Sequence, residues 1–512
     1  MVSFILRRVG VSALILIGAS FIMYTLTALS GDPLADLRES KLPNRDQLIA
    51  ARTQALNLDL PIPLRWLDWL RGAAGCLIPF ANSCDLGVTV NNAQVAEILP
   101  RAIVSTLQLV SGATVLAILL GVTIGILSAL RKDTGFDYSI TFLSFLLYSL
   151  PSFWVAVLLK IYVAIGFNDF LADPQISVWA AIVLAIVAGL IWQVLVGGTG
   201  RRRLIVFLGS AVVTGGLVSF LAAVDWFRYP SLGPVVIILG SLGLAVGITA
   251  LIAGLNNRRA LITAGINALV AIVAYFSLQN LFDISSFGTI AILALATVAV
   301  GIVTGFAMGG YDRGQSVQVG ALTAVASGGL VLLDRFMQSW NEYMTHPRIG
   351  ERPIATVGSS TPSLRGDFWI VGLDTFTHLA LPTLTLLLIS FAGYTRYARA
   401  GMLDVLQQDY IRTARAKGLS NRIVIVRHAF RNSLIPITTI VAADIGAILG
   451  GAIITEQVFA ISGMGALFSQ SLTKTDPNPV MGYFVVIAVV AIVFNFIADL
   501  AYAALDPRVR VR

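Results

Sequence analysis

Residues 402–436 read MLDVLQQDYIRTARAKGLSNRIVIVRHAFRNSLIP and form a polar island in an otherwise apolar C-terminal half. Between Asp404 and Asn432 this island carries six Arg or Lys side chains and two Asp side chains. Basic residues beside membrane-spanning segments are retained in the cytoplasm. The charge pattern therefore predicts a cytoplasmic segment, although a loop that only fixes the topology of the chain would carry similar charges.

Two helices joined by a glycine are predicted within the island. Gln407–Lys417 has good helix formers and no breaker, and Gly418 permits a left-handed turn. Ser420 or Asn421 can cap a second helix that runs to about Arg431. The predicted unit is a helix, a glycine elbow and another helix.

The elbow combines small residues with basic ones. Ala414, Ala416 and Gly418 would let the backbone of another protein approach closely. Arg412 and Arg415 lie three positions apart on one helical face, so they can reach carboxylates or phosphate together. These features predict a docking surface for a second protein.

The composition excludes an ordinary soluble domain. Apolar residues make up 57% of the 512 residues and charged residues only 12%, with a mean hydropathy of +0.84, whereas soluble domains carry about 25% charged residues. The net charge of +8 sits mainly in short turns between apolar runs, where membrane orientation explains it. We therefore expect an integral membrane protein that binds no nucleic acid.

Twelve apolar runs predict an all-α polytopic membrane protein with both termini in the cytoplasm. The first run is too long for the core of a signal peptide and lacks a clear A-x-A site, which favours a retained span over a cleaved signal. The runs are residues 9–29, 103–130, 139–166, 178–197, 204–224, 232–254, 260–281, 288–309, 317–338, 378–400, 434–455 and 481–504.

Several motifs together resemble one family. RTARAKGL at 412–419, followed by RHA and LIP, resembles the coupling ("EAA") loop of ATP-binding cassette (ABC) importer permeases of the dipeptide/oligopeptide (DppB/OppB) type. EQVFAISGMG at 456–465 resembles the E-x-x-F-x-x-x-G-x-G turn of that family, and DPRVR at 506–510 resembles its C-terminal ending. Asp85-Leu-Gly87, Pro100 to Leu107 and Leu150-Pro-Ser-Phe153 follow the family's order.

The resemblance implies a six-span permease core divided by a large insertion. Residues 1–170 would form the first part of the core, with three spans and an extracytoplasmic segment at about 30–98. Residues 171–345 would add six spans, and residues 346–512 would complete the core with the coupling loop at 402–436.

Basic turns recur in the insertion at a spacing of about 55 residues, at Arg201–Arg203, Arg258–Arg259 and Arg313. This spacing indicates either a triplicated helical hairpin or merely a regular alternation of spans and short loops. Asp334 and Arg335 are the clearest ionisable residues within its spans, and we expect them to neutralise each other.

The family resemblance implies a permease subunit, not an enzyme, that imports short peptides across the bacterial cytoplasmic membrane. Its expected partners are a second homologous permease, two ATP-binding subunits or one fused ATPase, an extracytoplasmic substrate-binding protein and membrane lipid. Since the sequence has no GxxxxGK[ST] motif, ATP and Mg would be used by the partner subunits and no cofactor by this chain. The substrate stays open among dipeptides, oligopeptides, glutathione and nickel. The resemblance assigns coupling to Arg412, Ala414, Arg415, Ala416, Lys417, Gly418, Leu419 and Ser420.

Polar or helix-breaking residues within the spans are candidates for a translocation path. Pro151 interrupts the third run and predicts a kink that frees a backbone carbonyl. Asp444, Asn495 and Asp499 lie deep in the last two runs and should face the interior of the bundle. There they would either line a polar path or tie helices together.

Cys76 and Cys84 are the two cysteines, and both lie in the segment expected outside the cytoplasm. An oxidising compartment and a short connecting loop favour a disulfide, with two free thiols or a metal site as alternatives. Because no His lies nearby, no metal site is predicted.

A secondary, ion-coupled carrier is the main alternative function, because twelve spans with cytoplasmic ends also fit that class. Such a carrier would be expected to bury more ionisable residues at mid-membrane than this sequence does. A scaffold that transports nothing would explain the insertion but not the coupling segment.

Overall fold

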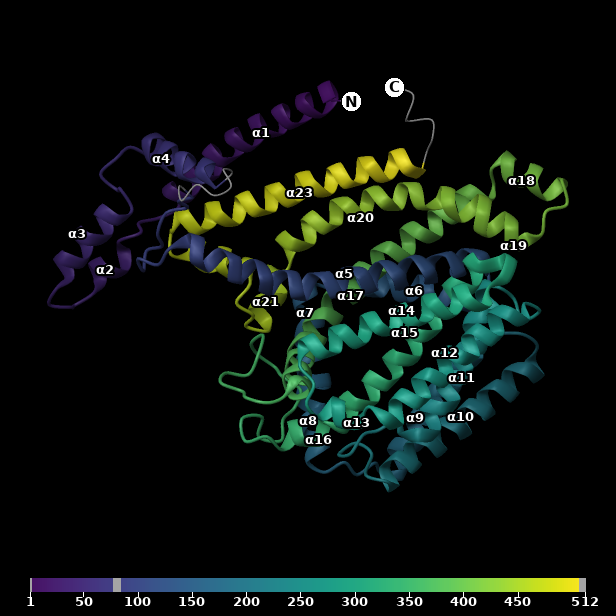
Figure 1. The fold of residues 1–512 in the computed structure, drawn as a ribbon. Helices are drawn as coiled ribbons and strands as arrows, with labels where there is room; N and C mark the ends of the chain where they lie inside the picture. The colour runs from purple at the N-terminus through teal and green to yellow at the C-terminus, as the bar shows by residue number, and fades with distance from the viewer. Residues whose placement is uncertain (1, 77–83, 506–512) are drawn as a thin grey trace.

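The computed structural model describes residues 2–76 and 84–505, and its named elements over these residues are helices (Figure 1). Extended segments meet there only at an isolated bridge of Val88 with Gln94. Ten of the described helices are long and apolar enough to cross a membrane, and they correspond to ten of the twelve predicted runs. The other two runs fall on helices α1 and α20. The all-α polytopic fold is therefore confirmed.

Two long helices, α5 and α17, form the centre of the helical core and pack along each other (Figure 1). Glycine on α5 allows this close approach. A Cβ atom at Gly125 would lie 2.5 Å from the carbonyl oxygen of Thr395, and one at Gly121 would lie 2.8 Å from the Cβ of Tyr394. The core helices are α1 (Val2–Leu29), α5 (Val95–Leu130), α17 (Phe368–Leu406), α20 (Arg431–Gly451) and α23 (Pro477–Leu505).

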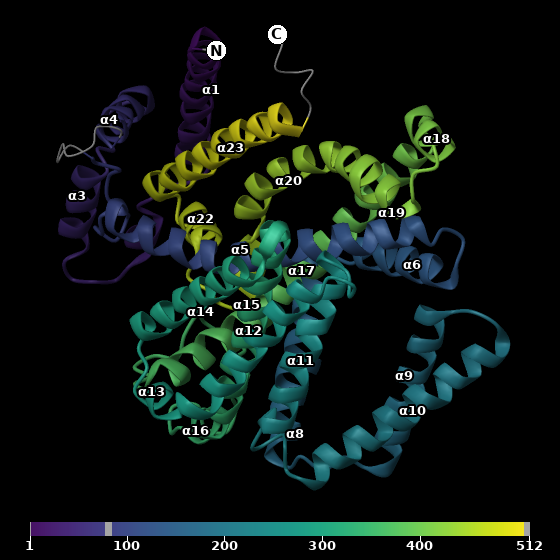
Figure 2. The same ribbon diagram turned by 45° about the vertical axis from the view of Figure 1, so that its right-hand side comes forward.

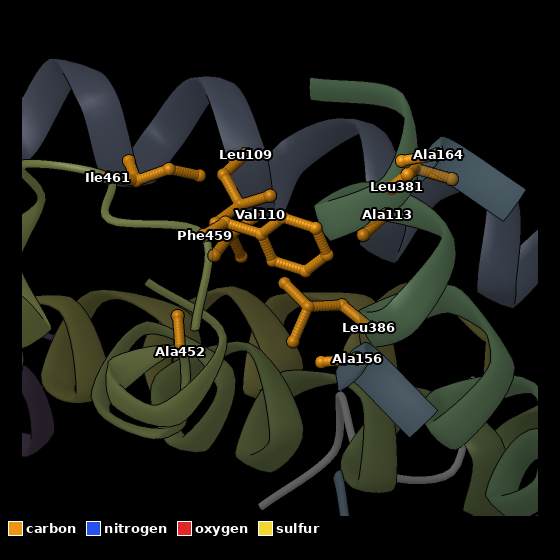
Figure 3. Close-up of a cluster of buried hydrophobic side chains, with 10 residues drawn as sticks. All are labelled: Leu109, Val110, Ala113, Ala156, Ala164, Leu381, Leu386, Ala452, Phe459 and Ile461. Atoms are coloured by element: carbon orange, nitrogen blue, oxygen red, sulfur yellow. The ribbon is translucent and has the colours of Figure 1, made fainter. Parts of the chain in front are cut away.

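A buried apolar cluster joins these helices in the middle of the core (Figure 3). The ring of Phe459, which is 1% exposed, lies among Leu109 and Val110 of α5 and Leu381 and Leu386 of α17. Phe459 belongs to the turn between α21 (Ile453–Val458) and α22 (Met464–Thr473). The turn after α20 is thus packed into the same core as the two central helices.

At Pro151 the third predicted run is interrupted and not merely kinked. Helix α6 ends at Ser149, and Leu150 and Pro151 are extended, with ψ angles of 130° and 139°. The apolar stretch long enough to cross the membrane is Ser152–Ala172, not 139–166. The segment consists of α6 (Gly135–Ser149), α7 (Ser152–Leu158), a π-helical turn (Leu159–Ile165) and α8 (Gly166–Ala172).

The insertion consists of three helical hairpins, each with a basic turn at its tip. Two of them pack side by side as a four-helix bundle, whereas α9 and α10 pack mainly on each other and stand apart (Figure 2). This geometry agrees with repeated hairpins, and their origin by duplication stays a prediction. The helices are α9 (Val178–Val196), α10 (Gly200–Ala223), α11 (Gly233–Ile252), α12 (Arg258–Ser277), α14 (Phe287–Met308) and α15 (Arg313–Gln338).

The four-helix bundle of the insertion is fastened to the start of α17 by an aromatic contact. Trp369 is fully buried, and its indole N–H donates to the carbonyl oxygen of Phe282 at 2.7 Å. The Phe336 ring packs edge-on against Trp369 with 4.9 Å between ring centroids. Because buried Trp carries both a large apolar surface and one donor, this contact fixes position and orientation together.

The expected pairing of Asp334 with Arg335 is wrong. The fully buried Asp334 carboxylate accepts hydrogen bonds from the backbone N–H groups of Leu232 and Gly233, at 2.6 and 3.2 Å. Arg335 pairs instead with Asp283, at 2.5 Å. Because consecutive side chains point in different directions around a helix, Asp334 and Arg335 contact different partners.

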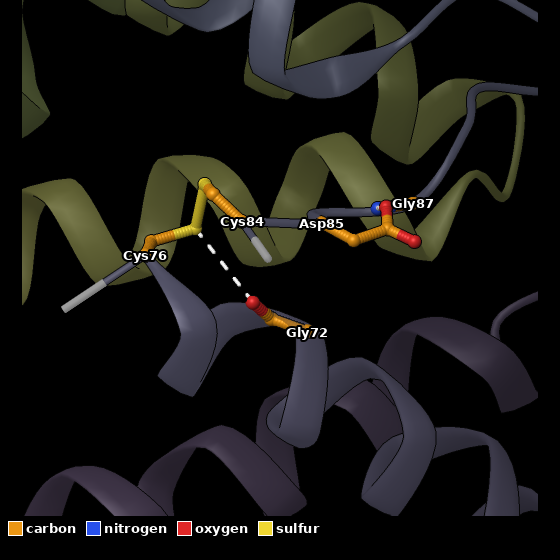
Figure 4. The surroundings of a disulfide bond; sticks show 5 residues. All are labelled: Gly72, Cys76, Cys84, Asp85 and Gly87. Carbon is orange, nitrogen blue, oxygen red and sulfur yellow. Dashed lines mark hydrogen bonds between the residues drawn. A yellow bond between two sulfur atoms is a disulfide. The ribbon is translucent and has the colours of Figure 1, made fainter. Parts of the chain in front are cut away.

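A small helical cap lies at the end of the core opposite the coupling segment (Figure 1). In it, Cys76 and Cys84 form a disulfide that holds the end of α4 beside the segment starting at Asp85 (Figure 4). The N–H of Asp85 also donates to the carbonyl oxygen of Gly72. The residues between the cysteines lie outside the described part of the chain. The cap helices are α2 (Ala35–Glu39), α3 (Arg45–Ala55) and α4 (Ile62–Gly75).

The cap is joined to the core through polar contacts at the start of α23. The Asp476 carboxylate accepts from the N–H of Val90 at 2.7 Å, and the Asn478 amide donates to the carbonyl of Val88 at 2.8 Å. Asp476 is 2% exposed, and its burial raises the pKa of this carboxyl to about 6, although the hydrogen bond from Val90 opposes that shift.

The raised pKa of Asp476 predicts a pH-dependent stability. Protonated Asp476 stabilises the folded state by on the order of 2–3 kcal/mol. This stabilisation is fully present below the unfolded pKa near 3.9, and it is lost as the pH rises through about 6. Asp476→Asn keeps an acceptor for Val90 but cannot ionise. The difference in stability between the variant and the wild type should therefore favour the variant more at pH 7.5 than at pH 4.5. Thermal unfolding in detergent measures this difference. A difference that is equal at both pH values would contradict this, and Asp46→Asn, in the exposed cap, is the control.

A second buried carboxylate supports the other end of the core. Asp137, which is 1% exposed, accepts two hydrogen bonds from Arg399 of α17 at 2.7 and 2.8 Å and one from Ser128 of α5 at 2.5 Å. The hydrogen bonds from Arg399 lower the pKa of Asp137 to about 2, against the opposing effect of burial. One carboxylate thus ties α6 to both central helices.

Removing this carboxylate should destabilise the core. Asp137→Asn leaves the Arg399 guanidinium without its ionic partner and should reduce the free energy of unfolding by about 1.5–3 kcal/mol. The measurement is thermal unfolding of the purified chain in detergent. Asp409→Asn removes a carboxylate from an ion pair that is 73% and 96% exposed, and it should have almost no effect. Equal losses in the two variants would refute the role of Asp137.

Candidate coupling site

The polar island folds as a helix, a glycine elbow and a second helix. Helix α18 spans Asp409–Ala416, and Gly418 follows with a φ of +77°, a conformation that favours glycine. The Ser420 hydroxyl caps α19 (Asn421–Ile423) by accepting from the N–H of Ile423 at 3.5 Å. A π-helical turn (Val424–Phe430) then continues directly into α20. The second helix is therefore the start of a span and not a separate element.

One face of α18 is seated on the chain's own core. Ile411 is fully buried and Ala414 is 8% exposed, in a cluster with Ala129 of α5, Met402 of α17 and Val424. The sequence suggested that Ala414 was small to admit a partner's backbone. Its side chain instead faces inward, so its small size serves the packing of α18 against these two helices.

The opposite face of α18 and the elbow are exposed. The Arg412 side chain is 73% exposed, and its ion pair with Asp409, at 3.6 Å, is too exposed to hold it firmly. The predicted coupling residues that share this exposed surface are Arg412, Arg415, Ala416, Lys417, Gly418, Leu419 and Ser420. This exposed surface is basic and lies at the end of the core farthest from the cap (Figure 1).

The insertion reaches the coupling segment directly. The Arg422 guanidinium donates to the carbonyl oxygen of Leu251, at the C-terminal end of α11, at 2.8 Å. A cation at a helix C-terminus is favoured by the exposed carbonyl groups there. The basic turn of α11 and α12 therefore lies on the same side of the molecule as the elbow.

Next to the apolar cluster in the middle of the core, the predicted E-x-x-F-x-x-x-G-x-G turn encloses a buried carboxylate. Glu456 is fully buried, accepting from the Thr106 hydroxyl of α5 at 2.6 Å and from the N–H of Ala466 at 2.9 Å. The same hydroxyl accepts from the N–H of Met464 at 2.8 Å. A Cβ atom at Gly463 would lie 2.3 Å from the carboxylate. The sequence motif marked this turn, but not Thr106, which comes from 350 positions earlier.

The candidate path residues are not brought together in one place. Pro151 separates α6 from α7, and Asp444 lies half-buried on α20 near the Tyr394 hydroxyl of α17. Asn495 is exposed on α23, so it does not face the interior of this chain's own bundle as expected. The side chain of Asp499 lies outside the described part. Within the described residues, no cluster of His, Cys, Asp and Glu could hold a metal ion.

Comparison with known proteins shows what the C-terminal part of the chain is similar to. Residues 350–511 match the family described as "Binding-protein-dependent transport system inner membrane component". The chain is 42% identical over 154 residues to the oligopeptide transport system permease protein OppB of Mycobacterium tuberculosis, which is 30% of this chain and 47% of that protein. It is 46% identical over 136 residues to the oligopeptide permease AppB of Bacillus subtilis, covering 27% and 43%. It is 39% identical over 142 residues to the glutathione permease GsiC of Pectobacterium atrosepticum, covering 28% and 46%.

The chain thus spans about half the length of the curated relatives that it matches. The family match includes the coupling segment and the turn around Glu456, and it leaves the insertion out. The resemblance to ABC peptide permeases is confirmed, and so is a multi-pass protein of the bacterial inner membrane. The motif DPRVR at 506–510 lies outside the described residues.

Because the side chain of Ala414 faces inward, a substitution can test whether this residue packs α18 on the core or contacts a partner protein. Ala414→Leu should overpack the contact with α5 and α17 at about 1–3 kcal/mol and so loosen α18. Limited trypsin digestion in detergent should then cut faster after Arg415 and Lys417. Ala416→Leu adds the same volume on the exposed face and should leave the cleavage rate unchanged. Equal cleavage in both variants would mean that Ala414 does not seat the helix.

Proposed function

We propose that this chain is a permease subunit of an ABC importer that moves short peptides across the bacterial cytoplasmic membrane. The observation that carries the proposal is the way α18 packs on the core. Its inner face is buried against α5 and α17, while its basic outer face and the elbow are exposed within the range matched to the family. Because α18 is packed on the two central helices and exposed on its other face, a force applied to α18 by another protein would be transmitted to α5 and α17. We call α18 and the elbow the lever.

The proposed source of that push is a separate ATPase. The sequence has no phosphate-binding GxxxxGK[ST] motif, so this chain would use ATP only through two ATP-binding subunits or one fused ATPase. Arg412, Arg415 and Lys417 give the exposed surface a positive charge, which favours a groove with acidic residues on the ATPase. No cofactor would bind to this chain itself.

The other proposed partners are a second homologous permease and an extracytoplasmic substrate-binding protein. The cap formed by α2, α3 and α4 lies opposite the coupling segment, which is the position required to receive substrate from outside. The names of the relatives, which include oligopeptide and glutathione permeases, support a short peptide as substrate. A secondary carrier is the alternative, and it has no need for the exposed lever.

The elbow provides the test of this proposal. Gly418 has a φ of +77°, which proline cannot adopt because its ring holds φ near −65°. In proteoliposomes containing the complete importer, Gly418→Pro should insert normally but lower ATP-driven uptake of a labelled tripeptide at least tenfold.

Gly350→Pro is the matched control. Gly350 also has a positive φ, of +62°, and its N–H also donates to a carbonyl within its turn, but it lies in the loop before α17. Uptake should therefore be largely retained in this variant. Wild-type uptake by Gly418→Pro would contradict the lever, and uptake driven by an ion gradient without ATP would favour the secondary carrier.

A further inference from the structure

A cavity of about 560 Å³ lies where the detached hairpin of the insertion meets the permease core. Its walls are residues 131 and 133–136, where α5 meets α6, together with residues 193–198 at the end of α9 and Arg203 in the first turn of α10. The Arg131 guanidinium crosses this boundary and donates to the carbonyl of Leu195 at 3.1 Å. Asp137, next to the cavity, binds Arg399 near the end of α17 that carries α18, so the cavity lies toward the coupling end.

The charged residues that line the cavity are Arg131, Arg203 and Asp133, so its lining carries a net positive charge. Three further basic residues, Lys132, Arg201 and Arg202, lie beside the lining residues in the sequence. Asp137 does not offset this charge, because it is already engaged by Arg399. The guanidinium groups are planar donors suited to bidentate contacts with phosphate oxygens.

The start of α10 lies next to the cavity and contributes Arg203 to its lining. The helix has 24 residues, and its first turn holds Arg201, Arg202 and Arg203 but no acidic residue. Within the described part of the chain, the Thr199 side chain makes no capping hydrogen bond to it. Basic residues at a helix N-terminus are unfavourable because they add to its partial positive charge, and an anion there would relieve this.

The helices leading away from the cavity are apolar and poorly covered by protein. Helices α9 and α10 have mean hydropathies of 2.4 and 2.2, and only 6% and 0% of the residues in their most apolar stretches are buried. Figure 2 shows this hairpin standing away from the four-helix bundle. Besides its packing on α6, the hairpin is held by the Arg131 contact and, at its other end, by Arg228, which donates to the carbonyl of Ala172 at 3.0 Å, and by the Phe227 ring against Phe170.

We propose that this cavity binds the headgroup of an anionic glycerophospholipid whose acyl chains lie against α9 and α10. Such a ligand combines a phosphate for Arg131 and Arg203 with apolar chains for the adjoining helix faces. The lipid completes the weak attachment of the hairpin to the core. This gives the inserted hairpin a role in lipid recognition, which does not depend on what the chain transports.

The test uses the purified full-length chain in detergent, titrated with phosphatidylglycerol, phosphatidylcholine or inorganic phosphate. Binding is followed by native mass spectrometry and by the thermal unfolding temperature. Phosphatidylglycerol should bind at least tenfold more tightly than phosphatidylcholine and should raise the unfolding temperature. Inorganic phosphate at the same concentration should do neither, because it lacks the acyl chains.

Arg203→Gln is the decisive variant, because Arg203 lines the cavity while its side chain is not needed to anchor the hairpin as that of Arg131 is. It should weaken phosphatidylglycerol binding about fivefold, as expected for one basic residue. Arg313→Gln removes the same charge from another basic turn of the insertion, outside the cavity, and should change nothing. Equal binding of the two lipids, equal effects of the two variants, or a full response to inorganic phosphate would each overturn the proposal.

Discussion

The close contact between α5 and α17 is the constraint on which the rest of the structure depends. Gly121 and Gly125 let the two backbones approach so closely that any side chain there would collide with α17. Protein interiors are densely packed and hardly compressible, so two helices in such contact move as one body or slide along one another. Everything attached to this pair is therefore mechanically linked.

Both ends of the pair carry an attachment. At one end α18 is seated through Ile411 and Ala414 on residues of α5 and α17. Toward the other end Thr106 of α5 holds Glu456 and the turn that follows α20. Thr106 and Ala129 are separated by 23 residues of one helix, or roughly 35 Å at 1.5 Å per residue. A displacement of α18 would thus be carried along α5 to the turn around Glu456, which is the linkage that the proposed mechanism requires.

The insertion is joined to this pair at few but specific points. Trp369 anchors the four-helix bundle to the start of α17, and Arg422 links the tip of α11 to the coupling segment. The α9–α10 hairpin is joined by smaller contacts: backbone carbonyl groups accept from Arg131 and Arg228, and the Phe227 ring packs edge-on against Phe170 of α8. The bundle is therefore positioned to respond to the coupling segment, whereas the hairpin is held mainly at its edges and leaves most of its surface for lipid.

The sequence by itself determined the membrane class, the apolar runs, the basic turns and the helix–glycine–helix island, because hydropathy, charge and glycine placement are local properties. Only the tertiary structure decided which side chains meet. It turned Ala414 inward, separated Asp334 from Arg335, left Asn495 exposed and brought Thr106 to Glu456 across 350 positions. Such pairings depend on how each helix is rotated and on how distant segments pack together. The hydrophobic periodicity of one sequence predicts neither of these. The break at Pro151 shows the same limit: the sequence marked the residue, but only the surrounding helices decided that the chain there would turn instead of bend.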